Sequence, residues 1–267
     1  MDEEKNQAEE KLPITDHLEE LRWRIIKSLI AVGAGFVASY YFSGRIFDFL
    51  ASPMIEVMPK GSTFIFTSPA EAFFTYMKVA FFTGLVFSAP VIFYQIWKFV
   101  MPGLYDNERK FVIPFVLVAT FFFFAGVAFG FFIVLPVGFA FFVGFASANI
   151  QVMPKMSEYL GFVMKFLLGF GCAFELPVFM YFLAKMGVVN AGMLRKNRKY
   201  AVLIVAVVAA ILTPGPDVAS QLMLGLPLYF LYELSIWVAQ IVGKRKARAK
   251  KAEPDKPAKK EPKQEAG

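Results

Sequence analysis

The chain has 267 residues, of which 57% are hydrophobic and 18% are charged, and its formal net charge is +7. Soluble globular domains are about 45–50% apolar and about 25% charged, so this composition excludes an ordinary soluble protein. Several uninterrupted apolar runs approach ~20 residues, the length that crosses a bilayer as a helix. The alternating segments of an outer-membrane barrel are absent. The sequence therefore predicts an all-α polytopic membrane protein.

Catalytic and metal-binding patterns are absent from the sequence. Cys172 and His17 are the only cysteine and the only histidine, so no His/Cys cluster exists that could hold zinc, haem or an iron–sulfur centre. No Gly-rich phosphate loop, nucleophile elbow or His-centred triad occurs. We therefore expect no enzymatic activity, no metal and no cofactor.

The first part of the chain predicts a polar terminus followed by a long helix. Residues 1–12 are rich in Glu and Lys without an apolar period, which favours disorder. Asp16 and Glu19 are spaced as in a capping box at the start of a helix. A short amphipathic helix then leads into a first span at about 25–42. An external loop follows at 43–70, with mildly amphipathic pieces that lie along the surface.

The second predicted span, about 72–101, is long: at 1.5 Å per residue it reaches about 45 Å, beyond the ~30 Å hydrocarbon core. We expect it to tilt or bend, with Pro90 as the kink. The fifth apolar run is short and reaches only about 21 Å, so thinning of the bilayer or a covering partner is expected there. The remaining segments are spans at 111–135, 159–186, 200–213 and 220–242, an external loop at 136–158 and a basic loop at 187–199.

The distribution of positive charge predicts the orientation. Lys and Arg are frequent in the N-terminal segment, near 98–110 and 185–199, and in the tail, whereas the opposite side carries only Arg45, Lys60 and Lys155. Positive charge favours the cytoplasmic side, so we expect six spans with both termini in the cytoplasm. The same distribution indicates contact with anionic lipid rather than nucleic acid. Three regions result: a disordered terminus at 1–12, a membrane domain at 13–243, and a basic flexible cytoplasmic tail at 244–267.

Five short motifs occur in order along the membrane domain. Each alone is a weak signal, but five together are a strong one. They are His17 to Arg24 (His-Leu-Glu-Glu-Leu-Arg-Trp-Arg), Ser68 to Glu71 (Ser-Pro-x-Glu), Pro90 to Arg109 (with Tyr-Gln-x-Trp-x-Phe and Pro-Gly-Leu-x-x-x-Glu-Arg), Phe174 to Pro177 (Phe-Glu-Leu-Pro), and Thr213 to Gln221 (Thr-Pro, Asp217 and Ser-Gln).

These motifs resemble TatC, the receptor component of the twin-arginine protein translocase, over roughly residues 13–243. The resemblance implies six kinked transmembrane helices in a concave, glove-like bundle of the bacterial inner membrane. It also implies binding of the twin-arginine signal peptides of folded cargo proteins, and export driven by the proton-motive force. The partners it implies are single-span TatA- and TatB-type membrane proteins, the lipid bilayer and further copies of this chain in a homo-oligomer.

The resemblance carries the peptide-binding site onto Glu20 and Glu108, with Glu19 as an auxiliary acid. A guanidinium is planar and permanently charged and grips a carboxylate with two hydrogen bonds. Reduced screening at the lipid–water boundary strengthens such a contact. A Lys–Lys peptide should bind less well, because a compact ammonium lacks the two-point contact. The competing interpretation is a solvated Glu20 paired with Arg24 at i,i+4, and a Glu108 balanced by Arg109.

Glu175 lies inside a predicted span, where an acidic residue is costly and indicates a functional site. Two structural interpretations compete: a protonated carboxyl that bonds the backbone freed by Pro177, or an acid that reaches to the near surface. The family interpretation is a polar point on a concave face that contacts the signal peptide or a partner helix. An alternative function is a proton-coupled secondary transporter with Glu175 as its proton carrier. A purely structural membrane scaffold is a third.

Polar residues of the late spans, Thr213, Gln221 and Glu233, are the candidates for contact with a partner helix. Interhelical hydrogen bonds in a membrane are worth about 0.6–2 kcal/mol each. The resemblance implies docking of TatA- and TatB-type partners along the fifth and sixth spans. Packing within the bundle is the alternative for each residue.

The first external loop contributes Pro53, Ser68 and Pro69 to the candidate residues. The prolines stiffen this loop because the ring restricts the backbone. The resemblance implies that the loop serves assembly and insertion of the signal peptide.

Overall fold

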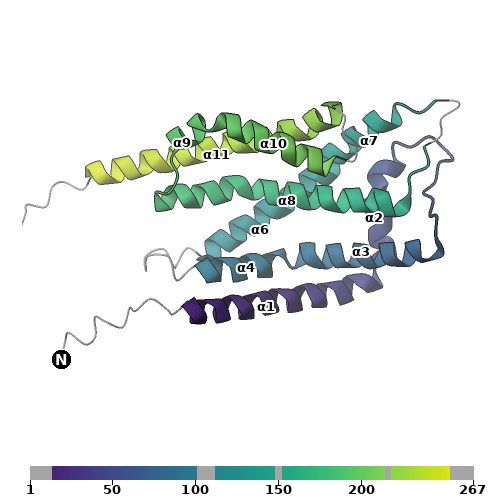
Figure 1. Ribbon diagram of the computed structural model, residues 1–267, viewed down its shortest axis with the longest axis horizontal. Coiled ribbons are helices and arrows are strands. Elements are labelled where there is room, and N and C mark those ends of the chain that lie inside the picture. The colour runs from purple at the N-terminus through teal and green to yellow at the C-terminus, as the bar shows by residue number, and fades with distance from the viewer. Residues whose placement is uncertain (1–13, 101–111, 148–151, 214–217, 253–267) are drawn as a thin grey trace, which may run out of the picture.

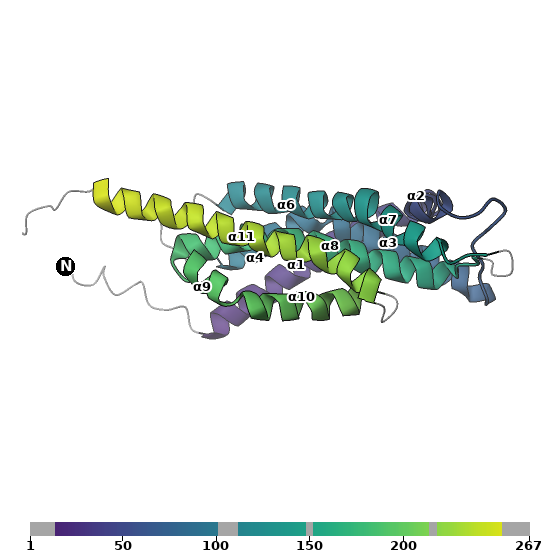
Figure 2. The same ribbon diagram turned by 90° about the horizontal axis from the view of Figure 1, so that it is seen from above.

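The computed structural model describes residues 14–100, 112–147, 152–213 and 218–252, and within these ranges it contains helices and no β-strand. Most helices run along one common direction, and α2 lies at the end of the bundle opposite the start of α1 (Figures 1 and 2). The elements are α1 (Ile14–Tyr41), α2 (Ser43–Ile55), α3 (Pro69–Phe87), α4 (Ala89–Val100), α6 (Val112–Phe129), the π-helical segment η2 (Gly130–Val134), α7 (Leu135–Val143), α8 (Met156–Met186), α9 (Ala191–Lys196), α10 (Arg198–Leu212) and α11 (Val218–Ala252).

The first external loop contains a helix. Phe42 leaves the helical conformation, and α2 continues at 85° to α1. Ser43 and Gly44 follow, and both are weaker helix formers than the apolar residues before them. Leu50 and Ala51 of α2 are buried in the main core, so the amphipathic pieces expected here form a helix that packs on the bundle.

Pro90 divides the second predicted span into α3 and α4, as expected. In a continuous helix its ring would clash with the carbonyl of Val86 and its missing N–H would leave a gap in the hydrogen bonding. The helix therefore ends at Phe87 and restarts at Ala89. Ser88 bridges the break, since its N–H donates to the Gly84 carbonyl at 3.0 Å and its carbonyl accepts from Ile92 at 3.0 Å.

The third apolar helix extends further than the sequence suggested. Residues 137–143 were expected in an external loop, but they form most of α7, which continues α6 through η2. The wider π-helical turn comes directly before the segment that holds Pro136, and the Leu135 N–H reaches back to the carbonyl of Gly130. A π-bulge absorbs the residue that lacks an N–H, so the helix passes Pro136 without ending.

Helix α8 forms the centre of the core. It packs against α3, α6 and α11, and Leu160, Val163 and Phe170 on it are completely buried. The helix ends at Gly187, whose φ of 87° is a left-handed conformation that glycine adopts without steric cost. The Val188 N–H then donates to the Leu183 carbonyl at 3.0 Å and closes the helix end.

Helices α1 and α3 cross in close contact at two glycines. A Cβ atom on Gly35 would lie 2.8 Å from the Gly84 carbonyl oxygen, and one on Gly84 would lie 2.5 Å from the backbone nitrogen of Phe36. Small residues allow helices in a membrane to approach in this way, where van der Waals packing drives association. The two glycines therefore determine the separation of α1 from α3.

The outer surface of the bundle is suited to lipid. Exposed apolar patches of this extent are not found on soluble monomers. Among the residues that the structure describes, four helical segments are long and apolar enough to cross a membrane, or five if the bent pair of α1 and α2 counts as one span. The 15-residue α10 lies below that length, so the sixth span is not established by length and composition. Exposed apolar residues include Leu29, Val37, Leu117, Phe121, Leu203 and Phe230.

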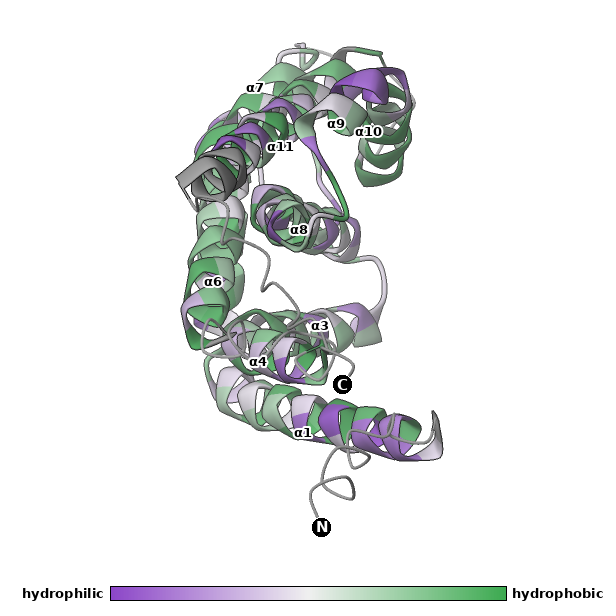
Figure 3. Ribbon diagram, turned by 90° about the vertical axis from the view of Figure 1, so that its left-hand side faces the viewer, coloured by the Kyte–Doolittle hydropathy of each residue, from purple (hydrophilic) through white to green (hydrophobic). Residues whose placement is uncertain are grey.

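Viewed along the bundle, the helices form an open arc from α1 through α3, α4 and α6 to α11 and α10, with α8 on its inner side (Figure 3). Helix α1 begins and α11 ends at the same end of the molecule (Figure 1). Helix α11 runs on to Ala252, so residues 244–252 of the predicted flexible tail are helical.

We predict that Gly35→Ala destabilises the protein by about 1–3 kcal/mol, the usual effect of overpacking, because the new methyl group meets backbone atoms of α3 that cannot move aside. Gly33→Ala is the matched control, since nothing lies within 4 Å of a Cβ atom at that position. Thermal unfolding of the purified protein in detergent measures both. Equal melting temperatures for the two variants would contradict the close crossing.

Candidate functional site

Glu20 lies near the start of α1, with 27% of its side chain exposed. Helical spacing places Arg24 one turn further along the same face, and the two side chains form an ion pair. The Nδ1 atom of His17 lies 3.6 Å from the other carboxylate oxygen. One carboxylate therefore meets a guanidinium on one side and an imidazole on the other.

Helix α4 completes the surroundings of Glu20. Arg24 donates through Nη1 to the side-chain oxygen of Gln95 at 3.5 Å. The ring of His17 stacks on Phe99, with centroids 4.3 Å apart and planes 15° apart. Two motifs that are far apart in sequence, His17 to Arg24 and Pro90 to Arg109, are thus brought together in space.

Trp97 anchors the end of α4 in the protein. Its ring lies 4.9 Å from that of Phe115 in α6 and 4.5 Å from that of Phe182 in α8. The three side chains form a small separate core at this end of the bundle. This packing holds α4 so that Gln95 and Phe99 remain in contact with α1.

Glu108 lies outside the described residues, so its distance from Glu20 is not defined. The helices that flank its segment are described: α4 ends and α6 begins at the end of the bundle where α1 begins (Figure 1). Glu19, which was expected to be an auxiliary acid, is exposed on α1. The structure thus places Glu20 beside α4, the helix that precedes the segment containing Glu108.

Glu175 is half-buried in α8. Its Oε1 atom is buried and has no hydrogen-bond partner in the described part of the chain. The backbone freed by Pro177 therefore does not satisfy this oxygen. An unsatisfied carboxyl oxygen within the apolar bundle is costly.

Glu233 on α11 is engaged within the chain. Its carboxylate accepts from Arg198 at the start of α10 at 2.7 Å and from the Tyr229 hydroxyl at 2.8 Å. Arg195 of α9 donates to Gln240 at 2.6 Å in the same region. These contacts tie the short helices α9 and α10 to α11.

Thr213 and Gln221 also bond within the bundle. The Thr213 hydroxyl donates to the Ala209 carbonyl at 3.0 Å, and the Gln221 amide donates to the Ala206 carbonyl at 2.8 Å. All three candidate partner-contact residues therefore make the intrachain contacts that were the alternative interpretation. A partner would have to bind beside these contacts or replace them.

The candidate residues of the first external loop belong to α2 and to the start of α3. Pro53 is buried within α2, so it packs in the core rather than stiffening an open loop. Ser68 occupies the N-cap position of α3 in an extended conformation, without a side-chain capping bond, and Pro69 is the first residue of the helix. Proline suits that position because its missing N–H would be unpaired there in any case.

Glu71 holds this end of the molecule together, a role that sequence reasoning missed. One carboxylate oxygen accepts from the N–H and hydroxyl of Thr67 at 2.8 and 3.1 Å. The other accepts from the N–H and hydroxyl of Ser157 in α8 at 3.2 and 2.6 Å. The available signal was the capping-box spacing of Ser68 and Glu71. Nothing in the spacing indicated Ser157.

A second pairing reinforces the same end. Ile65 and Lys155 form an isolated parallel β-bridge, with the Ile65 N–H donating to the Pro154 carbonyl at 3.1 Å and the Met156 N–H donating to the Ile65 carbonyl at 2.9 Å. The hydroxyl of Tyr159 donates to the Leu50 carbonyl at 2.9 Å. The segment before α3 and helix α2 are thereby both fastened to the start of α8.

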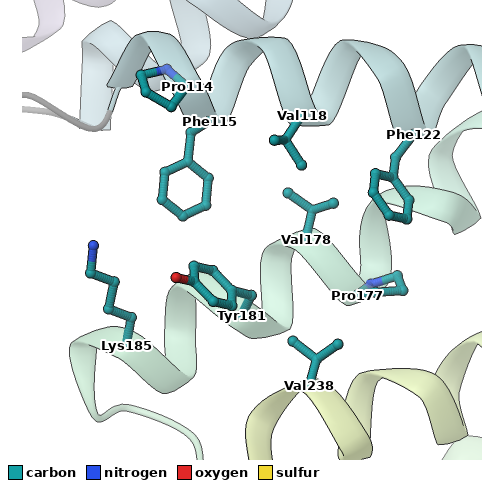
Figure 4. A pocket seen from close by; sticks show the side chains of 9 residues that line it. All are labelled: Pro114, Phe115, Val118, Phe122, Pro177, Val178, Tyr181, Lys185 and Val238. Carbon is teal, nitrogen blue, oxygen red and sulfur yellow. The ribbon is translucent and has the colours of Figure 1, made fainter. Parts of the chain in front are cut away.

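An apolar cavity of about 360 Å³ lies between α6, α8 and α11. Phe115 and Val118 line it from α6, and Pro177 and Val178 from α8 (Figure 4). Tyr181 and Lys185 contribute the polar atoms of its lining. The lining suits an apolar chain. Within the described residues, no group of three His, Cys, Asp or Glu side chains is arranged to hold a metal ion.

The fold and site define a class: a helical polytopic membrane protein with an acidic contact at the start of its first helix. A family described as Sec-independent protein translocase protein (TatC) matches residues 16–227. The chain belongs to the TatC family and is a component of a twin-arginine protein translocase, in a bacterial membrane.

Individual relatives agree with this assignment. The chain is 53% identical to the TatC protein of Desulforapulum autotrophicum over 241 residues, which cover 90% of this chain and 89% of the relative. It is 40% identical to TatC of Escherichia coli K12, over 90% of this chain and 93% of that protein. The crystal structure of the twin-arginine translocase receptor TatC superposes with a TM-score of 0.77 at 37% identity, covering 85% of this chain and 99% of that one.

We predict that Glu71→Ala lowers the melting temperature, because it leaves the donors of Thr67 and Ser157 without their acceptor. Glu158→Ala is the control: it removes a carboxylate from the same end, but one that is 78% exposed and contacts only Lys155 among the ion pairs described, at 3.7 Å. A thermal-shift assay in detergent compares the two variants. Equal shifts would show that Glu71 does not fasten α3 to α8.

Proposed function

We propose that this chain is the receptor subunit of the translocase and binds the two consecutive arginines of a signal peptide with Glu20 and Glu108, on the cytoplasmic face. The observation that supports this most directly is that Glu20 already holds a guanidinium, that of Arg24, while part of its carboxylate remains exposed. A site that holds one guanidinium has the charge and geometry to hold another. Glu19, exposed on the adjacent position, is the auxiliary acid.

The position of Glu108 in the chain supports its partnership with Glu20. Its segment leaves α4, the helix whose Gln95 and Phe99 contact the surroundings of Glu20, and enters α6. Two carboxylates on separate segments allow each guanidinium of the peptide its own acceptor. A twin-lysine peptide provides only point charges and binds more weakly.

The proposed topology has six spans with both termini in the cytoplasm of the inner membrane. The spans are α1, α3 with α4, α6 with α7, α8, α10 and α11. An even number of crossings returns the chain to its starting side, which agrees with α1 beginning and α11 ending at the same end (Figure 1). The excess of Lys and Arg at this end supports its cytoplasmic placement.

Helices α10 and α11 are the proposed docking surface for TatA- and TatB-type partners. Helix α10 has only 15 residues, and its Leu203, Ile204 and Ile211 are exposed. A partner helix would cover these side chains and compensate for the short span. The bonds of Gln221 and Glu233 fix the two helices relative to each other, and Thr213 bonds the last turn of α10, so these residues shape the surface. Further copies of the chain complete the assembly, and the proton-motive force supplies the energy.

We predict that Glu20→Ala and Glu108→Ala each weaken binding of a twin-arginine peptide by roughly tenfold or more, since each removes a charge-assisted contact worth about 1.5–3 kcal/mol. Affinity is measured with a fluorescent twin-arginine peptide and full-length protein in nanodiscs. Photo-cross-linking from positions 17–24 and 103–110, with a Lys–Lys peptide for comparison, locates the contact.

Asp16→Asn is the matched control for Glu20→Ala, because Asp16 is an exposed acid one turn earlier on α1. It removes the same charge from the same helix and should change the affinity by less than about twofold, as expected for an exposed charge. Wild-type affinity in the double variant of Glu20 and Glu108 would refute the proposed function.

Variants of Glu175 distinguish the receptor function from the alternative of a proton-coupled transporter. We predict that Glu175→Gln, which keeps a polar group of the same shape, leaves twin-arginine peptide affinity within about threefold, less than ~0.7 kcal/mol. Glu175→Leu should impair export of folded cargo across the membrane of vesicles, because it removes the polar side chain from this position in α8. Proton-driven uptake of a small solute that Glu175→Gln abolishes would favour the transporter instead. The unsatisfied Oε1 atom is the observation that keeps this alternative open.

A further inference from the structure

Arg24 places a guanidinium of the protein where the proposed function requires a guanidinium of the peptide. Only 12% of the Arg24 side chain and 27% of the Glu20 side chain are exposed. The contact is therefore partly shielded from water, where a charge-assisted hydrogen bond is stronger than at a fully solvated surface. A peptide guanidinium cannot use the same oxygen of Glu20 unless Arg24 moves.

Arg24 is also incompletely satisfied in this position. Its Nη2 atom bonds Glu20, and its Nη1 atom reaches Gln95 only at 3.5 Å. Its Nε atom is buried and has no hydrogen-bond partner in the described part of the chain. A guanidinium has five N–H donors, and a buried donor without an acceptor costs free energy. An arginine of the peptide, whose N–H donors are all free, can make a better contact with the Glu20 carboxylate than Arg24 does.

We propose that Arg24 is an internal competitor for the peptide-binding carboxylate. In the unliganded receptor it occupies Glu20, and an arginine of the signal peptide displaces it. The inference rests on the proposed function, because it requires that the peptide binds at Glu20. It gives Arg24 the role of setting the affinity for the signal peptide. The i,i+4 spacing indicates that Arg24 pairs with Glu20, but no motif or spacing indicates this role.

The competitor has a defined thermodynamic consequence. If Glu20 is unoccupied in only a fraction of the molecules, the apparent dissociation constant rises by the inverse of that fraction. The cost of displacing Arg24 is the same for every peptide, so the ratio of affinities for Arg–Arg and Lys–Lys peptides does not change. The absolute affinities fall together. Weakly bound basic sequences then drop below the concentrations at which they occupy the receptor, while twin-arginine peptides still bind.

The test is Arg24→Gln in the full-length protein in nanodiscs, with a fluorescent Arg–Arg peptide and its Lys–Lys counterpart as probes. We expect both peptides to bind about tenfold more tightly, which corresponds to Glu20 being unoccupied in roughly a tenth of wild-type molecules. Lys27→Gln is the matched control. Lys27 is exposed one turn further along α1, so this variant removes the same charge without freeing Glu20. Its effect should stay below about twofold.

Two further variants make the outcome decisive. Arg24→Lys keeps the positive charge but loses the planar guanidinium that contacts a carboxylate at two points, so it should tighten peptide binding by roughly threefold. This variant replaces Arg24→Gln in the test if Arg24→Gln does not fold. In a Glu20→Gln background, Arg24→Gln should have no additional effect on peptide affinity, as a double-mutant cycle requires for residues that act through one contact.

Three results would overturn the inference. Unchanged or weaker binding in both Arg24 variants, with binding still lost in Glu20→Ala, would make Arg24 a support for the carboxylate and leave the proposed function intact. A fall in the Arg–Arg to Lys–Lys affinity ratio in Arg24→Gln would also show that Arg24 orients Glu20. Wild-type affinity in both Glu20→Ala and Glu108→Ala would remove the proposed function and this inference together.

Discussion

The contact between Gly35 and Gly84 is the constraint on which the candidate site depends. Helix α1 packs chiefly on α3 and α4, so its position follows from this crossing. The eleven residues from Arg24 to Gly35 in α1 match the eleven from Gly84 to Gln95 in the antiparallel direction. At 1.5 Å per residue, eleven residues of helix span about 16 Å. Arg24 and Gln95 therefore lie beside each other, both about 16 Å along their helices from the glycine crossing. A side chain at either glycine would separate the helices and take Glu20 and His17 away from α4.

The acidic residues of the described helices differ in how they are satisfied. Glu71 accepts four hydrogen bonds from Thr67 and Ser157 and fastens helix ends. Glu233 is bound by an arginine and a tyrosine of its own chain. Glu175 has a buried oxygen without a partner. Glu20 is intermediate between these cases. Its cationic partner, Arg24, is present, but the N–H donors of Arg24 are only partly hydrogen-bonded in the described part of the chain. An acid of this kind can exchange the guanidinium of its own chain for one from a peptide.

Much of the fold and part of the site could be predicted from the sequence. Apolar runs of bilayer length gave the long helices, and the helix break near Pro90 followed from proline chemistry. Glu20 was a candidate because its motif resembles that of TatC, and the i,i+4 pairing with Arg24 followed from helix geometry. The contacts of Glu71 with Ser157 and of Arg24 with Gln95 could not be predicted. They join residues 86 and 71 positions apart, and no local pattern encodes which helices become neighbours.

The sequence alone determined that this protein is a helical membrane protein, because the burial of apolar runs in lipid depends on composition and length and not on neighbours. It also determined the helix break near Pro90 and the helix end at Gly187, where backbone chemistry acts locally. Only the tertiary structure decided that α2 and α7 are helices packed on the bundle, that Gln221 and Glu233 of α11 bond to α10, and that Arg24 of α1 contacts Gln95 of α4. Each of these depends on which side chains meet across helices, and those meetings follow from packing around α8 and from the close crossing of α1 with α3.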